Sequence, residues 1–505
     1  MTPTERVIFN TCAQYLKTFV NILFTLYSTR LILQSLGVSD FGIYSLLAGV
    51  IAMLAFATNA LASTTLRFLS YHQGKSNVEQ QKGVFATSFY IHIALGLITA
   101  AVLLLIIPLL FNGFLNIPAE RLDASKITYC FVTLILLITF VTAPFRAVLI
   151  SHENIIYLST VDILDGFLKV VTAIALSYVS YDKLIMYSIF LFSIHTINLF
   201  LIGGYGIIKY EECLIPTVKR VSKNYVTEIS SFAGWNIYSV GCIMGRTQGV
   251  ALVINKFFGT AVNAAYGLGF QIGGYVNFMS ESLLNAIRPQ IIRSEGEGNR
   301  PKMLLISELA SKYSFFLLSC LAIPCIFEMP TLLKLWLDDV PDYAVLFCRM
   351  VLIASIVDSI TIGLGVANQA IGNVKQYSLA VNSIKLITLP VVLAATLITS
   401  SVTLIAVTYV VFELICAITR VPFVSRTGGL EIWSFVKRIF TSLVIPLYVF
   451  IIASYGISTF VTFKYRFLLT FVIPPILYVF TFYLFGMPKT EREIVNNIIR
   501  KRKKK

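Results

Sequence analysis

Residues Leu36 to Asn77 read LGVSDFGIYSLLAGVIAMLAFATNALASTTLRFLSYHQGKSN, and a related stretch returns from Phe258 to Asn299 as FGTAVNAAYGLGFQIGGYVNFMSESLLNAIRPQIIRSEGEGN. The two copies are 222 positions apart, the spacing of Tyr44 and Tyr266 (266 − 44 = 222). At that spacing Gly37 pairs with Gly259, Gly74 with Gly296, Asn77 with Asn299 and Pro108 with Pro330. A constant register over these residue types indicates an internal duplication.

The composition is that of a membrane protein. Of the 505 residues, 57% are hydrophobic and only 13% are charged, and the mean hydropathy is +0.81. A soluble domain is about 45–50% apolar and about one quarter charged. The net charge of +15 does not point to nucleic acid, because the Lys and Arg residues gather in alternate loops, as the positive-inside rule requires.

The chain divides into fourteen predicted helices, because a bilayer core takes about 20 apolar residues per span. The first half contains helices at 7–35, 41–70, 83–112, 126–149, 154–180 and 184–209, and the second half at 227–256, 261–292, 302–328, 343–368, 375–398 and 401–424, followed by 432–457 and 462–486. The predicted fold is therefore an all-α integral membrane protein with 14 transmembrane helices. Two parallel six-helix repeats surround a central cavity, and two C-terminal helices lie outside the repeat.

The same division predicts the domain bounds. An N-terminal six-helix bundle covers 1–210, a cytoplasmic linker 211–226, a C-terminal six-helix bundle 227–426, the last two helices 427–486 and a basic cytoplasmic tail 487–505. Basic residues flank the joins after the second, eighth and twelfth helices, so these joins and both termini are expected to be cytoplasmic. The basic tail is expected to lie on the anionic headgroups of membrane lipids.

No arrangement of residues in the sequence is typical of an enzyme. G-x-S-x-G, H-E-x-x-H and the phosphate-binding P-loop are absent, and the four histidines are far apart. The eight cysteines are scattered, with no C-x-x-C, and most lie in apolar runs. We therefore predict no catalytic residue, no metal ligand and no cofactor, and a protein that is not an enzyme.

The informative residues are charges inside the predicted helices, because such charges usually face a watery cavity or a partner. The cations are predicted to line a cavity for an anionic substrate, since Arg in particular binds phosphate through two charge-assisted hydrogen bonds. They are Arg30, Arg246, Lys17, Lys169 and Lys385. Carboxylates predicted to couple an ion or to charge the cavity are Asp162, Asp165, Glu281 and Asp358, and Glu413 is a further intramembrane charge. The structural alternative is buried pairing, as between Lys169 and Asp165, or snorkelling near helix ends.

The sequence resembles a known family of transporters. An LG-x-x-D-F-G-x-Y run covers Leu36 to Tyr44, and Leu66-Arg67-Phe68-Leu69 follows near the end of the second helix. With two parallel six-helix halves and two further helices, the chain is similar to the Wzx-type O-antigen and capsule flippases. These form the polysaccharide transporter branch of the multidrug/oligosaccharidyl-lipid/polysaccharide exporter superfamily. In the second copy of the run the motif is degraded to Asn263-Ala264-Ala265-Tyr266.

The resemblance implies a flippase in the bacterial inner membrane. Its substrate would be an undecaprenyl-pyrophosphate-linked oligosaccharide repeat unit, an anionic lipid-linked partner, moved by alternating access for O-antigen, capsule or exopolysaccharide biosynthesis. The resemblance also implies a polymerase and other glycan-assembly proteins as partners. Nucleic acid is not expected as a partner. The alternative is a cation-coupled multidrug or small-molecule exporter of the same superfamily. The lipid II flippase is a more distant candidate, and a membrane polymerase or acyltransferase is disfavoured because the predicted outer joins are short.

One pairing across the repeat generates a test. Asp162, Asp165 and Lys169 are three and four residues apart and so share one helical face. If Tyr157 corresponds to Tyr377, at a spacing of 220 (377 − 157), Asp165 corresponds to Lys385. We hypothesise a charge pair across the cavity between these two residues. Reversing either charge should abolish function and exchanging both should restore it, as measured in a complementation assay; a double variant that stays inactive would contradict the pair.

Overall fold

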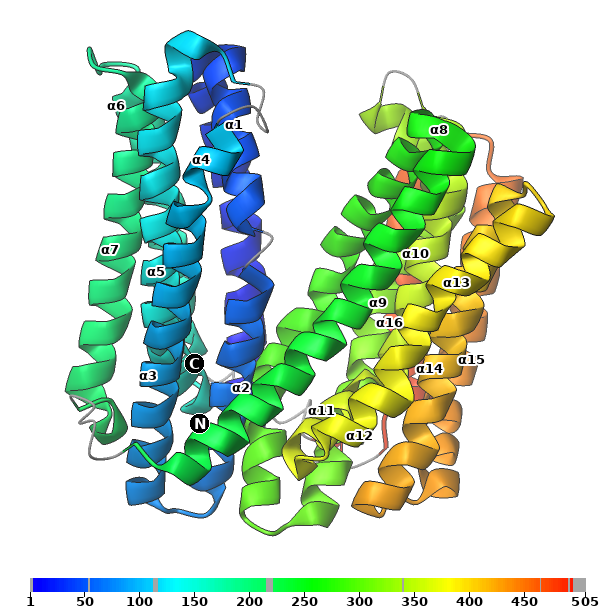
Figure 1. Cartoon of the computed structure of the whole chain (residues 1–505). Helices are drawn as coiled ribbons and strands as arrows, with labels where there is room; N and C mark the ends of the chain where they lie inside the picture. Colours follow the sequence, from blue (N-terminus) through cyan, green and yellow to red (C-terminus); the bar gives the residue numbers. More distant parts are fainter. Residues whose placement is uncertain are drawn as a thin grey trace, which may run out of the picture. The chain divides into compact units, whose positions relative to one another are not determined.

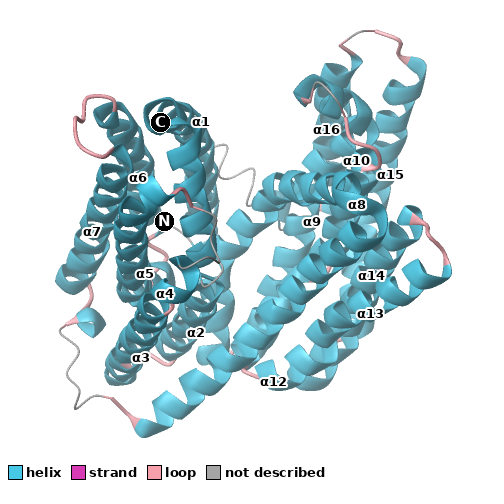
Figure 2. Cartoon of the chain, turned by 45° about the horizontal axis from the view of Figure 1, so that its top comes forward, coloured by secondary structure: helices cyan, strands magenta, loops and turns pink. Residues whose placement is uncertain are grey.

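The computed structural model describes residues 3–52, 55–111, 117–214, 221–337, 340–463, 465–488 and 491–493. All regular secondary structure in these ranges is helical (Figures 1 and 2). The chain forms two compact units: Met1–Ile237 with Gly296–Gly298, and Tyr238–Glu295 with Asn299–Lys505. The domain bounds given above stay a prediction, and residues 215–220 of the proposed linker lie outside the described ranges.

The first unit is a bundle of long helices. Its elements are α1 (Pro3–Ala52), α2 (Ala55–Gly74), α3 (Val78–Leu105), α4 (Ile107–Leu109), η2 (Ala119–Arg121), α5 (Leu122–Ser151), α6 (Ile155–Leu176), α7 (Lys183–Lys209) and η3 (Glu211–Cys213). The helix α8 (Lys223–Gly296) begins in this unit and continues in the second. Buried aliphatic and aromatic side chains of α1, α3, α5, α6 and α7 form its core, including Leu47, Tyr129 and Phe140.

The second unit packs the rest of α8 against the following helices. These are α9 (Arg300–Trp336), α10 (Ala344–Ser359), α11 (Ile362–Ile371), α12 (Val374–Tyr377), η5 (Ser378–Asn382), α13 (Ser383–Ile398), α14 (Val402–Gly428), α15 (Ile432–Phe460), α16 (Arg466–Thr481) and η6 (Phe482–Gly486). η5 and η6 are short π-helical turns. The core lies between α8, α9, α10 and α14, around Phe347, Leu318 and Tyr409.

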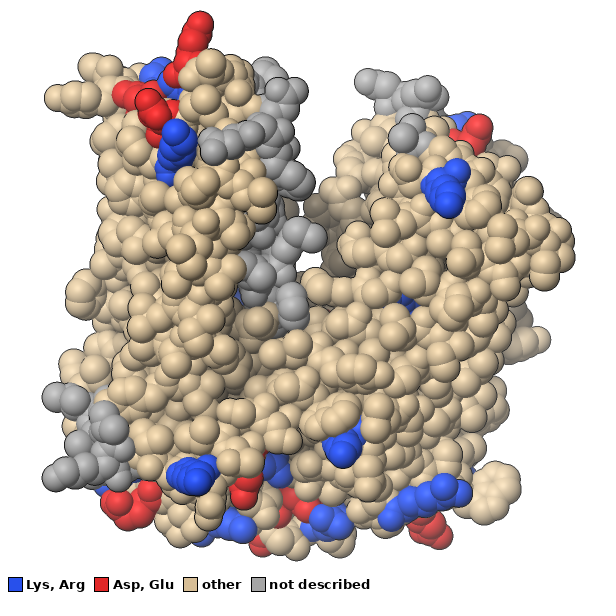
Figure 3. Space-filling model, in the orientation of Figure 1, with Lys and Arg blue, Asp and Glu red and all other residues tan. Residues whose placement is uncertain are grey.

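The helices have the length and composition of membrane spans. Ten helical segments of the described chain are long and apolar enough to cross a bilayer, and eleven if the bent pair α10 and α11 counts as one span. In Figure 3 the charged side chains of each unit lie mainly near the ends of its helices, and the surface between is mostly uncharged. The protein is therefore a multi-pass membrane protein.

The predicted helices are found at the expected places, although the count of fourteen is approximate. Except for residues near some ends, the turn at 360–361 and positions 53–54, 112 and 464, which lie outside the described ranges, the predicted ranges fall on helical residues. The range 343–368 is divided, because the axis turns by 49° between α10 and α11. α6 is helical but not among the ten apolar segments, since its 22 residues carry Asp162, Asp165 and Lys169.

The internal duplication is visible in the backbone. Gly37 interrupts α1 with φ 78° and ψ 167°, and Gly259 interrupts α8 with φ 86° and ψ 178°. A positive φ with extended ψ is accessible almost only to glycine, so the same kink requires the same residue in both copies. The caps also repeat: the Asn77 side chain accepts a hydrogen bond from the backbone N–H of Gln80, and Asn299 accepts one from Lys302.

The aspartate of the LG-x-x-D-F-G-x-Y run has a structural partner. Arg121 donates to Asp40 through Nε at 2.8 Å and to Asp182 through Nη1 at 2.6 Å. Asp182 also caps α7 by accepting from the backbone N–H of Leu184. Burial would raise the pKa of Asp182, but hydrogen bonds from Arg121 and from the backbone outweigh it and hold the pKa below its usual value. The run therefore fixes the segment after the α1 kink to the starts of α5 and α7.

A proline in the second unit has its own compensation. Pro330 lies inside α9 and cannot donate a hydrogen bond to the carbonyl of Ile326, four residues earlier. Arg349 of α10 donates to that carbonyl oxygen instead, at 2.9 Å. The charged side chain satisfies a backbone group that would otherwise be costly in an apolar environment.

Close packing of α9 against α11 generates a stability prediction. A Cβ at Gly363 would lie 2.1 Å from the carbonyl oxygen of Ser307, and the backbone N–H of Gly363 donates to Ser311 Oγ. We expect Gly363→Ala to lower the free energy of unfolding by about 1–3 kcal/mol, as overpacking does. Thermal unfolding of the purified protein in detergent measures this.

Gly267 supplies the matched control, because a Cβ there would meet nothing within 4 Å. Gly267→Ala should leave stability unchanged or raise it by up to about 1 kcal/mol, since alanine favours a helix. Equal behaviour of the two variants would contradict the close approach of α9 and α11.

Candidate functional site: a charged cavity in the second unit

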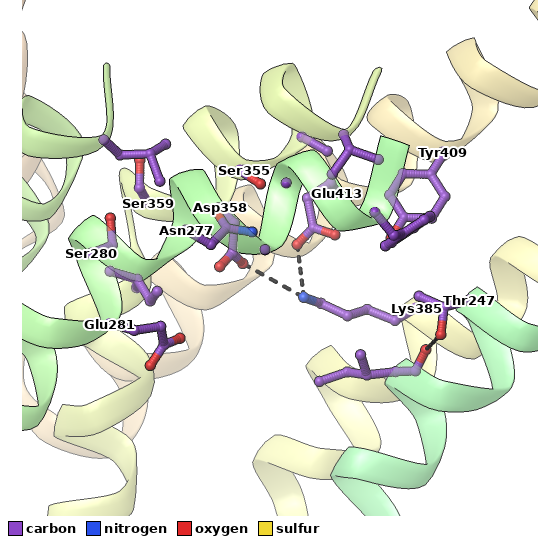
Figure 4. A pocket seen from close by; sticks show the side chains of 18 of the residues that line it. Thr247, Asn277, Ser280, Glu281, Ser355, Asp358, Ser359, Lys385, Tyr409 and Glu413 are labelled. Carbon is purple, nitrogen blue, oxygen red and sulfur yellow. Dashed lines mark hydrogen bonds and ion pairs between the residues drawn. The ribbon is translucent and has the colours of Figure 1, made fainter. Parts of the chain in front are cut away.

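A cavity of about 320 Å³ opens among α8, α9, α10, α11, α13 and α14 within the second unit. Its wall carries an unusual number of polar side chains for a membrane-spanning region (Figure 4). They are Arg246, Thr247, Asn277, Ser280, Glu281, Ser355, Asp358, Ser359, Lys385, Tyr409 and Glu413. Charged groups inside spans are rare and usually mark a pathway for a substrate or an ion, so this cavity is the candidate site.

Five side chains from four helices form one network of ion pairs at this cavity. Glu413 of α14 lies 2.5 Å from Arg246 Nη1 of α8 and 2.8 Å from Lys385 Nζ of α13. Lys385 Nζ also lies 3.6 Å from Asp358 Oδ1 of α10. The same Asp358 oxygen is 2.6 Å from Arg420 Nη2. Three cations and two carboxylates give a net charge of 3 − 2 = +1.

The side chains at the Arg246 end of the network are almost completely buried, and Asp358 is partly exposed. The Arg246 side chain is 5% exposed and Glu413 3%, whereas Asp358 is 25% exposed. Charges as buried as Arg246 and Glu413 are tolerated only when paired and hydrogen-bonded. The Asp358 end of the network is therefore the end that water or a solute reaches.

Local sequence explains how the helices bring these groups together. Glu413 and Arg420 are seven residues apart, two turns on one face of α14. Gly245 and Gly249 flank Arg246, and a Cβ at either would lie within 2.9 Å of a leucine side chain of α13. Small residues let helix backbones approach, so α8 can come close to α13 on both sides of Arg246.

Arg246 is held in place by more than its carboxylate. Its guanidinium lies 4.2 Å from the ring centre of Tyr409, a cation–π contact. Its Nε is buried and has no hydrogen-bond partner among the described residues, as is also true of Arg420 Nε.

The first unit contains a separate charge cluster. Asp162 of α6 lies 3.1 Å from Lys17 Nζ of α1 and 2.7 Å from Arg146 Nη2 of α5. Asp165 pairs with Lys169 at 2.7 Å and accepts from Asn198 at 2.7 Å. This cluster also has three cations and two carboxylates, a net charge of +1. Its side chains are 19–41% exposed, so it is wetter than the network of the second unit.

The structure thus groups the predicted site residues in two sets. Arg246, Lys385 and Asp358 join one network, and Glu281 lines the same cavity. Lys17, Asp162, Asp165 and Lys169 lie in the first unit, where Lys169 makes the local pair with Asp165 that the spacing allows. Arg30 is exposed on α1 and makes no ion pair with the described residues. No role in substrate binding or ion coupling is tested by these positions, and all nine roles stay predictions.

The sequence analysis missed one member of the second-unit network and one member of the first-unit cluster. Arg420 is one of the basic residues that flank the join after the twelfth predicted helix and was not predicted as a site residue, and Arg146 was not singled out. The signal for Arg420 was its seven-residue spacing from Glu413. The hypothesis of a pair between Asp165 and Lys385 stays a prediction, but each residue has ion-pair partners inside its own unit.

Comparison with known proteins is informative only at the level of structure. No family model and no curated protein matches the sequence. Among solved structures, a MATE transporter crystallised in a bent conformation superposes with a TM-score of 0.73 at 14% identity, over 87% of this chain and 98% of the other. The MATE transporter ClbM in complex with Rb⁺ superposes with a TM-score of 0.72 at 16% identity, over 86% of this chain and 96% of the other.

A MOP superfamily transporter from Pyrococcus furiosus superposes with a TM-score of 0.69 at 14% identity, over 87% of this chain and 96% of the other.

The fold is that of the MATE transporters.

Within this MATE fold, the second unit holds its charges as a connected network, which generates a stability prediction. Glu413→Gln removes the carboxylate shared by Arg246 and Lys385 and leaves two buried cations facing each other. We expect a loss of about 3–5 kcal/mol in the free energy of unfolding, because breaking a buried pair leaves an uncompensated charge. Thermal unfolding in detergent measures it.

Two controls accompany this variant. Asp123 is 94% exposed and pairs only loosely with Lys126, so Asp123→Asn should leave the unfolding temperature unchanged. Adding Arg246→Met to Glu413→Gln returns the network charge to +1 and should recover part of the loss. If Glu413→Gln is as stable as the wild type, the network does not hold α8, α13 and α14 together.

Proposed function

We propose that the protein is a membrane transporter that binds its solute in the cavity of the second unit and moves it by alternating access. The observation that carries the proposal is a polar cavity with a buried ion-pair network in a chain that has the fold of transporters. A structural role alone would not require a cavity of about 320 Å³ lined by ionisable groups. Nothing in the site has the arrangement of a hydrolytic or transfer enzyme, and the similar structures are transporters.

The similar structures support export of a small molecule better than transport of a lipid-linked sugar. The similar structures include MATE transporters, one of them described as a multidrug resistance transporter in an outward-facing conformation. The cavity has the size of a small-molecule site, which is about 300–1,000 Å³. Apolar and aromatic side chains such as Phe270, Leu318 and Tyr409 accompany its charges. An amphipathic small molecule with one polar group would satisfy this lining.

A flippase for a polyprenyl-pyrophosphate-linked oligosaccharide is the second candidate. One observation favours it: the network of the second unit and the charge cluster of the first unit each carry one more cation than carboxylate. An anionic group would balance that surplus, and Arg binds phosphate well. The similar Pyrococcus furiosus transporter is described as having a binding pocket of reverse polarity that suggests a different function. In this candidate the chain would lie in a bacterial inner membrane with cytoplasmic termini, beside glycan-assembly proteins.

The experiment that separates the two candidates uses a strain depleted of the protein. If the solute is a small molecule, depletion should lower efflux of a panel of amphipathic dyes and leave surface glycan unchanged. If it is a lipid-linked sugar, the oligosaccharide should accumulate on the cytoplasmic leaflet, which is measured by probing its sidedness. Absence of both effects would contradict the proposed function.

Arg246→Ala tests the site within the same experiment. It should reduce the rescued transport rate about tenfold, equivalent to about 1.4 kcal/mol, because it removes a charged guanidinium that lines the cavity. Lys126→Ala, at a partly exposed position whose side chain pairs with Asp123, should rescue fully. Full rescue by a well-folded Arg246→Ala variant would remove Arg246 from the site and leave the transporter proposal standing.

A further inference from the structure

The place between Asp358 and Glu413, the two carboxylates of the ion-pair network in the second unit, is filled by a side chain. Lys385 reaches from α13 so that its ammonium lies 2.8 Å from Glu413 of α14 and 3.6 Å from Asp358 of α10 (Figure 4). We propose that Lys385 is a built-in cation of this site, and that the second unit as folded does not bind a free monovalent metal ion there. The proposal rests on the proposed function only in naming this cavity as the transport site.

The atoms at the centre of the network support this assignment. Arg246 contacts Glu413 through Oε2, and Lys385 contacts Oε1. The Lys385 ammonium, 2.8 Å from Oε1, is the counter-charge of that oxygen. Lys385 also shares Asp358 Oδ1 with Arg420. Both carboxylates are thus occupied on the side that faces Lys385, and a metal ion would have to displace the ammonium.

The charge count leads to the same conclusion. With Lys385 the network carries +1, and a bound Na⁺ would raise it to +2 in a region where the Arg246, Arg420 and Lys385 side chains are each less than 10% exposed. Like charges at such a site repel strongly because water screens them poorly. Without the lysine charge the network carries 2 − 2 = 0, and one Na⁺ restores +1.

The donor set left behind by the lysine fits a hard cation. Asp358 and Glu413 would present oxygens, and Asn277, Ser355 and Ser359 line the same cavity with amide and hydroxyl oxygens. Alkali and alkaline-earth ions are bound by such oxygens in proteins.

The inference changes the role predicted for Asp358 from sequence. The sequence predicts Asp358 as a carboxylate that couples an ion or charges the cavity. In the structure its carboxylate is paired with Lys385 and Arg420. Any inorganic ion that couples transport therefore acts at another place in the chain, or only after the ammonium has left Asp358 and Glu413.

Sodium binding to the purified full chain in detergent tests the inference without measuring transport. The probe is radiolabelled Na⁺, and the unfolding temperature is recorded in NaCl and in choline chloride at equal ionic strength. We expect no saturable Na⁺ binding that depends on Asp358 in the wild type or in Lys385→Arg, which keeps the positive charge. Lys385→Met should gain saturable Na⁺ binding and a higher unfolding temperature in NaCl, since a ligand that binds the folded state stabilises it.

Adding Asp358→Asn to Lys385→Met should abolish the gain. Saturable Na⁺ binding by the wild type that is lost in Asp358→Asn would overturn the inference. So would the absence of binding in folded Lys385→Met and in the more polar Lys385→Gln variant. Because binding is read directly, failure of the transport proposal would appear in the depletion experiment and not here.

Discussion

The second unit depends on one electrostatic constraint: a carboxylate buried to 3% exposure in a membrane-spanning helix has to be neutralised by neighbours. Glu413 meets this condition by drawing Arg246 from α8 and Lys385 from α13 to the same point on α14. Lys385 extends the constraint to Asp358 on α10. Four helices are thus fixed around a cavity, and the glycines beside Arg246 allow the backbone approach that the pairing needs.

Both units pair charged side chains within their helical bundles, but the paired side chains differ in their exposure to solvent. The charge cluster of the first unit and the network of the second each contain two carboxylates and three cations, and each unit has a glycine kink at the same place in the repeat. In the first unit the charges are partly exposed, and Asp165 finds its cation one turn away on its own helix. In the second unit the pairs join different helices and are nearly dry. Water screens the first set, so the second set contributes more to specificity and to the position of its helices.

The fold indicates a transporter but does not identify the solute, which depends on the chemistry of the cavity. A likeness at 14–16% identity establishes the MATE architecture, and one architecture serves many solutes. The wall of this cavity carries an ion-pair network in which a lysine lies between two carboxylates. These groups decide whether an amphipathic molecule or an anionic lipid headgroup is preferred, because an unpaired charge excludes the solute that cannot neutralise it.

The helical membrane class, the approximate helix positions and the duplication could be predicted from the amino-acid sequence. Hydrophobic length and the spacing of Gly37, Gly259, Asn77 and Asn299 are local properties that survive without knowledge of packing. The sequence also identified Arg246, Asp358 and Lys385 as intramembrane charges, since their cost in hydrocarbon depends on composition alone. Which charge pairs with which was decided only by tertiary structure. Arg420 joins the network because helix rotation brings it to Asp358, 62 residues earlier in the chain, a contact that no local pattern contains.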